Sequence, residues 1–280
     1  MNLLSKGLYI VSTPIGNLDD ITLRAIDILK KSDIILCEDT RHSLKLLKHL
    51  KIKKKLISYH KFNEKKQLSK VIEYLNDGKI LSLISDAGTP TLSDPGDILV
   101  KECIEKKINV YPIPGPSSIT AAMSIAGFGH QFVFYGFLPK TEKELEKVLK
   151  SLKDIDFSII FFFSGIKINF YLKYLKKIFF ERKILIAREI TKLHESLYRS
   201  DVDKIEMFEH SLKGELTVVI SKKITKSKNI DDVEIKKQAI EYLKKYSLKD
   251  VAELISKKEK IARKKVYQIC LKIKKNEKIS

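Results

Sequence analysis

The first half of the chain alternates short apolar runs with longer amphipathic stretches. The apolar runs have the length of buried strands and lie at residues 8–11, 34–37, 56–58, 80–84 and 109–111. The stretches between them carry apolar residues at helical spacing and lie near residues 23–29, 42–50, 64–76, 96–106 and 117–126. This alternation predicts βα units, and therefore a mostly parallel sheet with helices on both faces.

The second half continues the α/β pattern and then changes character. Strands are predicted at residues 159–163, 183–187 and 217–221, with a hairpin beginning at residues 194–198. Three lysine-rich amphipathic helices follow, near residues 233–246, 248–257 and 260–273. We therefore expect three domains, namely residues 1–128, 129–226 and 227–280. The last fits a helix-turn-helix nucleic-acid module and a plain three-helix cap equally well.

Four loops rich in glycine and proline follow predicted strands of the first half. They lie at residues 12–17, 38–42, 85–90 and 112–118, and six of the seven prolines of the chain lie in or beside them. Proline fixes the backbone, and glycine lets the main chain approach a ligand closely. Because parallel strands end at one edge of a sheet, the loops predict a preorganised ligand site in the crevice beyond that edge.

The net charge of +19 is concentrated in the C-terminal tail, where residues 222–280 hold 19 Lys and Arg against 8 Asp and Glu. Clustered cations favour a polyanionic partner there, because their binding releases counterions from a phosphate backbone. Only six of the 54 basic residues are arginines, however, and the chain is also rich in isoleucine and asparagine. Drift of the surface toward lysine in an AT-rich coding sequence explains the charge about as well.

The sequence lacks the signature motifs of several classes of enzyme and of membrane protein. There is no P-loop, no Gly-x-Gly-x-x-Gly after the first strand and no Gly-x-Ser-x-Gly elbow, and the six histidines show no metal-ligand spacing. No apolar run is long enough to cross a bilayer, and no signal peptide precedes the first strand. The three cysteines are scattered. We therefore expect a cytoplasmic protein without a metal or a membrane contact.

The loop sequences resemble one family as a set. The blocks, in chain order, are Thr13-Pro14-Ile15-Gly16-Asn17, Glu38-Asp39-Thr40-Arg41-His42, Ser85-Asp86-Ala87-Gly88-Thr89-Pro90, Ser93-Asp94-Pro95-Gly96, Pro114-Gly115-Pro116-Ser117, Gly136-Phe137-Leu138-Pro139, Ala187-Arg188-Glu189 and Lys213-Gly214-Glu215. Together they resemble the tetrapyrrole-methylase superfamily, and within it the bacterial methyltransferases that act on the 2′-oxygen of cytidine 1402 in 16S ribosomal RNA. The resemblance covers nearly the whole chain.

The resemblance implies two α/β domains of the tetrapyrrole-methylase type with S-adenosylmethionine in the cleft between them, and a small helical domain after them. It also implies a homodimer and, as substrate, 16S rRNA within the 30S subunit. The residues expected to contact the cofactor are Thr13, Pro14, Gly16, Asp86, Ala87, Gly88, Ser93, Asp94, Pro116, Ser117, Thr120 and Ala121.

Methyl transfer to a ribose hydroxyl needs a group that accepts the hydroxyl proton, and no metal. The candidates are Glu38, Asp39, Asp86 and Lys192, with His60 and Glu189 beside them. The candidate contacts to RNA are Arg41, His60, Arg188 and Lys192. Each arginine could instead belong to an ion pair, for instance Arg41 with Asp39 or Arg188 with Glu189.

One segment departs from the family. Where relatives carry an acid, a histidine and an arginine after a strand of the second domain, this chain has Phe163, Ile166 and Lys167. Two rival functions follow from the sequence. One is a methyltransferase of the same superfamily that acts on a tetrapyrrole, and the other is a non-catalytic rRNA-binding relative, which the altered segment would suit.

Overall fold

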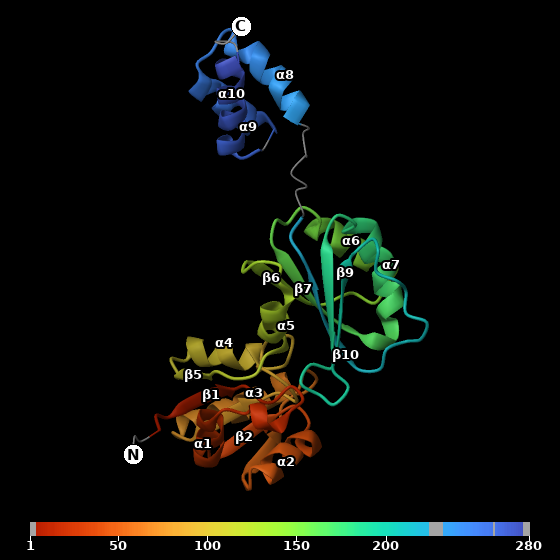
Figure 1. Cartoon of the computed structure of the whole chain (residues 1–280). Helices are drawn as coiled ribbons and strands as arrows, with labels where there is room; N and C mark the ends of the chain where they lie inside the picture. The colour runs from red at the N-terminus through yellow and green to blue at the C-terminus, as the bar shows by residue number, and fades with distance from the viewer. Residues whose placement is uncertain (1–3, 224–231, 260, 277–280) are drawn as a thin grey trace. The chain divides into compact units, whose positions relative to one another are not determined.

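The computed structural model of the chain describes residues 4–223, 232–259 and 261–276. The chain divides into two compact units, residues 1–223 and residues 224–280 (Figure 1). The first unit contains two five-stranded sheets, and the second contains three helices. The domain boundary expected at residue 226 lies outside the described residues, and the boundary expected at residue 128 stays a prediction.

The first sheet is entirely parallel, as the alternation of apolar runs predicts. Its strands lie in the order β3-β2-β4-β1-β5 and span Lys55–Ser58, Ile34–Cys37, Ile80–Ile84, Gly7–Val11 and Val110–Ile113. The strands at its centre are buried on both faces, which explains their continuous apolar sequences. The carboxyl ends of all five strands therefore meet at one edge.

Helices cover the two faces of this sheet in pairs. Helices α1 (Leu23–Lys31) and α2 (Thr40–His49) pack on one face, and α3 (Glu64–Asn76) and α4 (Asp97–Glu105) pack on the other. Helix α5 (Ser118–Ala126) has the expected span but a different partner. It lies against the second sheet (Figure 1), because its small and aliphatic residues fit Ile160, Leu185 and Val219 there.

The second sheet is mixed, in the order β6-β7-β10-β8-β9. Its strands span Phe132–Phe137, Ser158–Ser164, Glu215–Ile220, Lys183–Arg188 and Ser196–Asp201. Only β6 and β7 are parallel. Helices α6 (Glu142–Leu152) and α7 (Ile168–Ile178) cover the face opposite α5. The sequence did not predict strand β6, because an irregularity near Gly136 interrupts its alternation. Two short 3₁₀ turns lie at Leu18–Asp20 and Gly165–Lys167.

The second unit is a three-helix module with its own core. Helices α8 (Asp232–Leu243), α9 (Leu248–Glu259) and α10 (Arg263–Asn276) bury apolar residues against one another. Ile235 is buried there, whereas Ile240, which the sequence places on the apolar face, is 44% exposed. In the described part of the chain, no helix has the length and apolar character needed to cross a membrane. The three cysteines are buried and unpaired, as the sequence predicts.

Candidate functional site

The glycine- and proline-rich loops of the first sheet are bonded to one another. The backbones of Thr13 and Gly88 exchange two hydrogen bonds, of 2.8 and 3.0 Å. The hydroxyls of Ser12 and Thr89 lie 2.8 Å apart, and the Asp39 amide donates to Oδ1 of Asp86 at 3.2 Å. These bonds join three loops into one rigid surface at the carboxyl edge of the sheet, where the sequence predicts a ligand site.

A cleft of about 610 Å³ opens above this surface, within the size range of small-molecule sites. Its first wall comes from the loops of the first sheet, at residues 15, 38, 86–89, 92–94 and 117–119. Its second wall comes from the second sheet and its loops, at residues 137, 162–164, 187, 189–190, 192 and 214–217. The cleft therefore lies between the two sheets, as the family resemblance implies.

The lining of the cleft is acidic although the chain is strongly basic. Its charged residues are Glu38, Asp86, Asp94, Glu189 and Glu215, together with Lys192. Five carboxylates against one ammonium give a site of net negative charge in a protein of net charge +19. Such a site attracts a cation and repels an anion.

Two carboxyl groups of the first wall have raised pKa values. Burial, with a further contribution from the charge of Glu38, raises the pKa of Asp94 from 3.8 to about 6. Burial also raises the pKa of Glu38, and the charge of Asp86 adds to the effect. The charge of Asp86 contributes to both increases, so the carboxylates gathered on this wall disfavour the ionisation of their neighbours.

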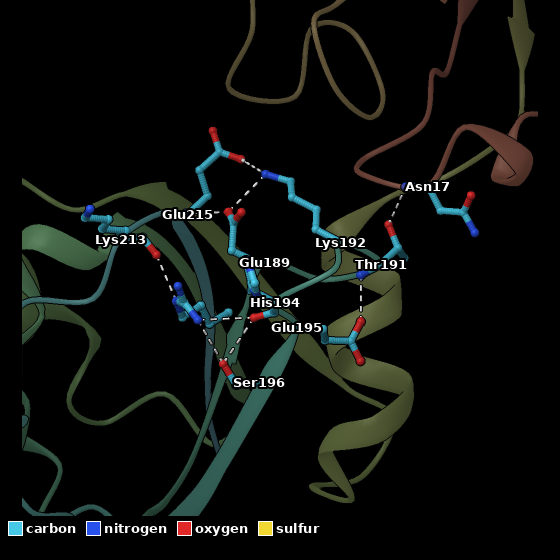
Figure 2. Close-up of polar contacts among 10 residues, drawn as sticks. Asn17, Glu189, Thr191, Lys192, His194, Glu195, Ser196, Lys213 and Glu215 are labelled. Atoms are coloured by element: carbon cyan, nitrogen blue, oxygen red, sulfur yellow. Dashed lines mark hydrogen bonds and ion pairs between the residues drawn. The ribbon is translucent and has the colours of Figure 1, made fainter. Parts of the chain in front are cut away.

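Lys192 lies between two carboxylates of the second wall (Figure 2). Its Nζ is 3.0 Å from Oε1 of Glu189 and 3.5 Å from Oε2 of Glu215, and Oε1 of Glu189 also accepts the Glu215 amide at 3.0 Å. Burial alone would raise the pKa of Glu189, but these two donors outweigh it and lower that pKa. Burial alone would lower the pKa of Lys192, but the two carboxylates outweigh it and raise that pKa. The lysine is therefore a fixed cation.

The loop that carries Lys192 is strained and reaches the first sheet. Glu189 and Thr191 have φ values of 51° and 66°, which residues with a β-carbon rarely adopt. The backbone amide of Asn17 donates to Oγ1 of Thr191 at 3.0 Å, and the backbone amide of Thr191 donates to the Glu195 carboxylate (Figure 2). A β-carbon on Gly16 would lie 2.5 Å from Cγ of Lys192, so only glycine fits at this point. These contacts hold the two walls together.

The structure places the expected cofactor residues in three groups. Asp86, Ala87, Gly88, Ser93, Asp94 and Ser117 line the cleft. Ser117 also borders a second, open depression together with Pro116, Thr120 and Ala121. Thr13, Pro14 and Gly16 line neither. Thr13 is buried beneath the cleft, where its backbone bonds to Gly88, and Gly16 makes room for Lys192.

Some of the expected catalytic and RNA-binding residues line the cleft, and others lie outside it. Glu38, Asp86 and Lys192 line the cleft, whereas Asp39 does not. Its carboxylate is paired with the exposed Arg41 guanidinium at 2.7 Å, and the hydrogen bonds from Arg41 hold the pKa of Asp39 well below its usual range. Outside the cleft, Nδ1 of His60 accepts the Phe62 amide at 3.2 Å.

The observed partners of Arg188 are two backbone carbonyls and a hydroxyl, not the Glu189 carboxylate, and its contact to RNA stays a prediction. Its guanidinium donates to the backbone carbonyls of Lys213 and His194, at 2.8 and 3.1 Å, and to the hydroxyl of Ser196. It therefore ties together the two loops that supply Glu215 and Lys192. The arginine positions the second wall and does not line the cleft.

Sequence reasoning missed most of the second wall. Phe137, Phe162, Phe163 and Glu215 all line the cleft. Phe163, which the resemblance places where an acid is expected, is buried against Tyr171 with ring centroids 4.6 Å apart. Ile166 is 69% exposed, and neither it nor Lys167 lines the cleft. The block Lys213-Gly214-Glu215 was the available signal, because its match to the family indicated a site residue near Glu215.

Comparisons with known proteins agree with this geometry. The profile of the family described as tetrapyrrole (corrin/porphyrin) methylases matches residues 7–206. The "Ribosomal RNA small subunit methyltransferase I" of Mesomycoplasma conjunctivae is 46% identical over 226 residues, which are 80% of this chain and 94% of that protein. The protein of the same name from Buchnera aphidicola subsp. Schizaphis graminum is 41% identical over 285 residues, 98% of this chain and 99% of that protein, tail included.

Solved structures show the same fold at low sequence identity. The methyltransferase CobJ is 17% identical, with a TM-score of 0.59 over 78% of this chain and 95% of that one. Uroporphyrin-III C-methyltransferase from Thermus thermophilus, complexed with S-adenosyl homocysteine, is 15% identical, with a TM-score of 0.52 over 76% and 96%. The profile match spans the first sheet, strands β6 to β9 of the second sheet and the loop that carries Lys192, and it ends before β10. The chain belongs to the tetrapyrrole (corrin/porphyrin) methylase family.

Proposed function

We propose that this protein transfers a methyl group from S-adenosylmethionine to the 2′-oxygen of a cytidine ribose in 16S ribosomal RNA. The observation that carries the proposal is the acidic cleft between the two sheets of a basic chain. Relatives at 41–46% identity named as ribosomal RNA small subunit methyltransferases support it, and one of them matches this chain over 98% of its length.

The cleft fits S-adenosylmethionine in charge and in size. The cofactor carries a sulfonium and an ammonium, and five carboxylates line a space of about 610 Å³. On the first wall, Asp86, Gly88 and Asp94 would hold it. Gly88 has a φ of 81° and only one side-chain atom within 4 Å of an added β-carbon, so its backbone is open to a ligand. When bound, the cofactor supplies an electrophilic methyl group.

The same charge argues against a tetrapyrrole as acceptor. Tetrapyrrole substrates of this superfamily are acidic macrocycles, and the carboxylates of the cleft would repel them. A ribose hydroxyl is neutral, and the phosphates beside it can bind outside the cleft. The non-catalytic alternative, an rRNA-binding protein, is also disfavoured. Such a protein would not need the hydrogen-bonded loops or the carboxyl groups with raised pKa values that the first wall contains.

We assign the proton acceptor to the neighbouring carboxyl groups of Glu38 and Asp94. As the 2′-oxygen attacks the methyl carbon, its proton passes to this pair, and both raised pKa values suit a base that works near neutral pH. Asp39 is a poor base because Arg41 holds its pKa low, and Lys192 is a poor base because two carboxylates keep it protonated. Lys192, the one cation among the described residues that line the cleft, would instead contact a phosphate beside the target ribose.

The proposed methylation of rRNA also suggests which partners this protein binds. The tail, whose described helices expose lysines 236, 237, 244, 249 and 264, would bind rRNA phosphates. The family resemblance implies a homodimer and an assembled 30S subunit as acceptor, and the sequence pattern suggests a cytoplasmic location. Deletion of residues 228–280 is expected to weaken binding of the subunit while leaving cofactor affinity intact, since residues 1–223 form their own compact unit. Unchanged affinity for the subunit would reduce the tail to a structural cap.

The first test is calorimetric titration with S-adenosylmethionine, followed by transfer of a tritiated methyl group to 30S subunits that lack the modification. We expect cofactor binding and label in 16S RNA, at one nucleotide whose phosphodiester resists alkaline hydrolysis because its 2′-oxygen is methylated. Label on a uroporphyrin-type tetrapyrrole and none on RNA would establish the first rival. RNA binding without any cofactor binding would establish the second.

A further inference from the structure

Strand β6 ends in an irregularity that turns one aromatic ring toward the cleft. In the register of β6 with β7, Phe134 lies opposite Ile160, Gly136 opposite Phe161 and Phe137 opposite Phe162. One residue, Tyr135, is therefore extra on β6, which is the arrangement of a β-bulge. Regular alternation would place Phe134 and Phe137 on opposite faces of the sheet, because they are three residues apart.

The bulge instead places both rings on one face. The ring centroids of Phe134 and Phe137 lie 4.9 and 5.5 Å from that of Phe162, both in edge-to-face contact. Tyr135 contacts Phe161, on the other face. The bulge requires glycine at residue 136, where φ is 92° and an added β-carbon would lie 3.0 Å from Oγ of Ser93. The regular hydrogen-bond ladder between β6 and β7 is therefore interrupted next to Phe137, which lines the cleft.

Phe137 is not there to fill the core. Its side chain is 63% exposed, and it lines the cleft on the second wall. Because ligand clefts are lined largely by apolar and aromatic side chains, an exposed phenylalanine in the lining of this cleft offers a ligand an apolar face. The expected cofactor contacts that line the cleft, such as Gly88 and Ser117, all come from the first wall. Phe137, on the second wall, does not belong to that expected set and is available to the methyl acceptor.

We propose that Phe137 is the platform on which the base of the target nucleotide stacks. The inference rests on the proposed function, since it takes a nucleotide of RNA as the acceptor. Proteins that take a single nucleotide out of folded RNA hold its base against an aromatic ring, because every base has a π-face and the contact replaces the lost stacking. Stacking on Phe137, with Phe162 supporting the ring from its edge, would hold the attached ribose in the cleft beside the carboxylates.

The test is Phe137→Ala, with binding of 30S subunits and of S-adenosylmethionine measured separately. We expect affinity for the subunit to fall about tenfold, the usual effect of removing one stacked aromatic ring, with cofactor affinity unchanged. Phe137→Tyr should retain wild-type affinity, and Phe137→Leu should resemble the alanine variant, because leucine is apolar but offers no ring. Phe180→Ala is the matched control: Phe180 is 50% exposed in the same domain and does not line the cleft.

A second measurement separates stacking from any structural effect. Reconstituted subunits whose target nucleotide lacks its base should bind wild-type protein about tenfold more weakly, and Phe137→Ala should then cause no further loss. A further tenfold loss on the abasic subunit would overturn the proposal. So would weaker cofactor binding with unchanged subunit binding, which would make Phe137 a contact of the cofactor's adenine. Failure of the proposed function is distinguishable, because the wild-type protein itself would then transfer no methyl group to RNA.

Discussion

The two walls of the cleft are built by different means. The first wall consists of loops that follow parallel strands, held together by backbone bonds such as those between Thr13 and Gly88. The second wall comes from a mixed sheet and depends on a bulge at Gly136, positive φ values at Glu189 and Thr191, and an arginine that ties two loops.

The walls also differ in charge and in surface. The first carries the carboxyl groups with raised pKa values, Glu38 and Asp94, whereas the second carries Lys192 and an exposed phenylalanine, Phe137. Our proposals therefore divide the labour: the first wall would hold the cofactor and accept the proton, and the second wall would hold the acceptor. The following predictions test that division.

The largest expected effect is on the first wall. Asp94→Asn keeps the shape of the side chain and removes a proton acceptor, so we expect kcat to fall by about a hundredfold while affinity for 30S subunits stays unchanged. Single-turnover methyl transfer measures the rate. Asp97→Asn is the control, since Asp97 lies nearby on α4, is exposed and does not line the cleft. A loss of cofactor affinity at unchanged kcat would return Asp94 to the purely cofactor-binding role that the sequence suggests.

On the second wall, Lys192→Met removes the proposed phosphate contact. We expect about tenfold weaker binding of 30S subunits, and a reduction of about one in the slope of log affinity against log salt concentration. Filter binding over a series of salt concentrations measures both. Lys213→Met is the control, because its side chain is exposed and lies outside the cleft. An unchanged salt slope would show that Lys192 contacts no phosphate.

The pH dependence of the rate tests the coupling within the first wall. The base must be unprotonated, so kcat should fall as the pH drops through about 6, the pKa of Asp94. Glu38→Gln removes a negative charge that raises this pKa, so the acid limb of the residual activity should move to lower pH. A limb that stays in place would contradict the assignment of Glu38 and Asp94 as an interacting pair.

The smallest expected effect is that of Asp94→Asn on the stability of the fold. This substitution should raise stability although it lowers activity. The pKa of Asp94 is higher in the folded protein than the ordinary 3.8, so its ionisation destabilises the folded state, fully so above about pH 6. With allowance for solvent screening, Asp94→Asn should stabilise the protein by about 1–2 kcal/mol at pH 7.5. The corresponding rise in Tm is about 2–6 °C and should vanish as the pH approaches 4. A lower Tm at pH 7.5 would show that Asp94 stabilises the fold.

Much of the first wall could be predicted from the sequence. Buried parallel strands give uninterrupted apolar runs, and the turn residues between them are glycine and proline, so the strands near Leu8, Ile35 and Leu83 and the loops after them were correctly located. The position of Asp86, Gly88 and Asp94 at one edge follows from parallel topology alone.

The second wall could not be predicted, for reasons that are physical. A single bulge reverses the alternation of β6, so a local pattern cannot show that Phe137 shares a face with Phe134. The partner of α5 was likewise hidden, because its apolar face fits either sheet and only the assembled unit selects the second.

The sequence by itself determined the parallel sheet, the four loops at its edge, the family and the helical tail. Only the tertiary structure decided which charges meet in the cleft. Lys192 and Glu215 are 23 residues apart in the chain, and Glu38 and Asp94 lie on separate strand-end loops, yet their side chains line one cleft. The pKa of each depends on burial and on neighbours brought together by folding, and neither quantity is encoded in any local run of residues.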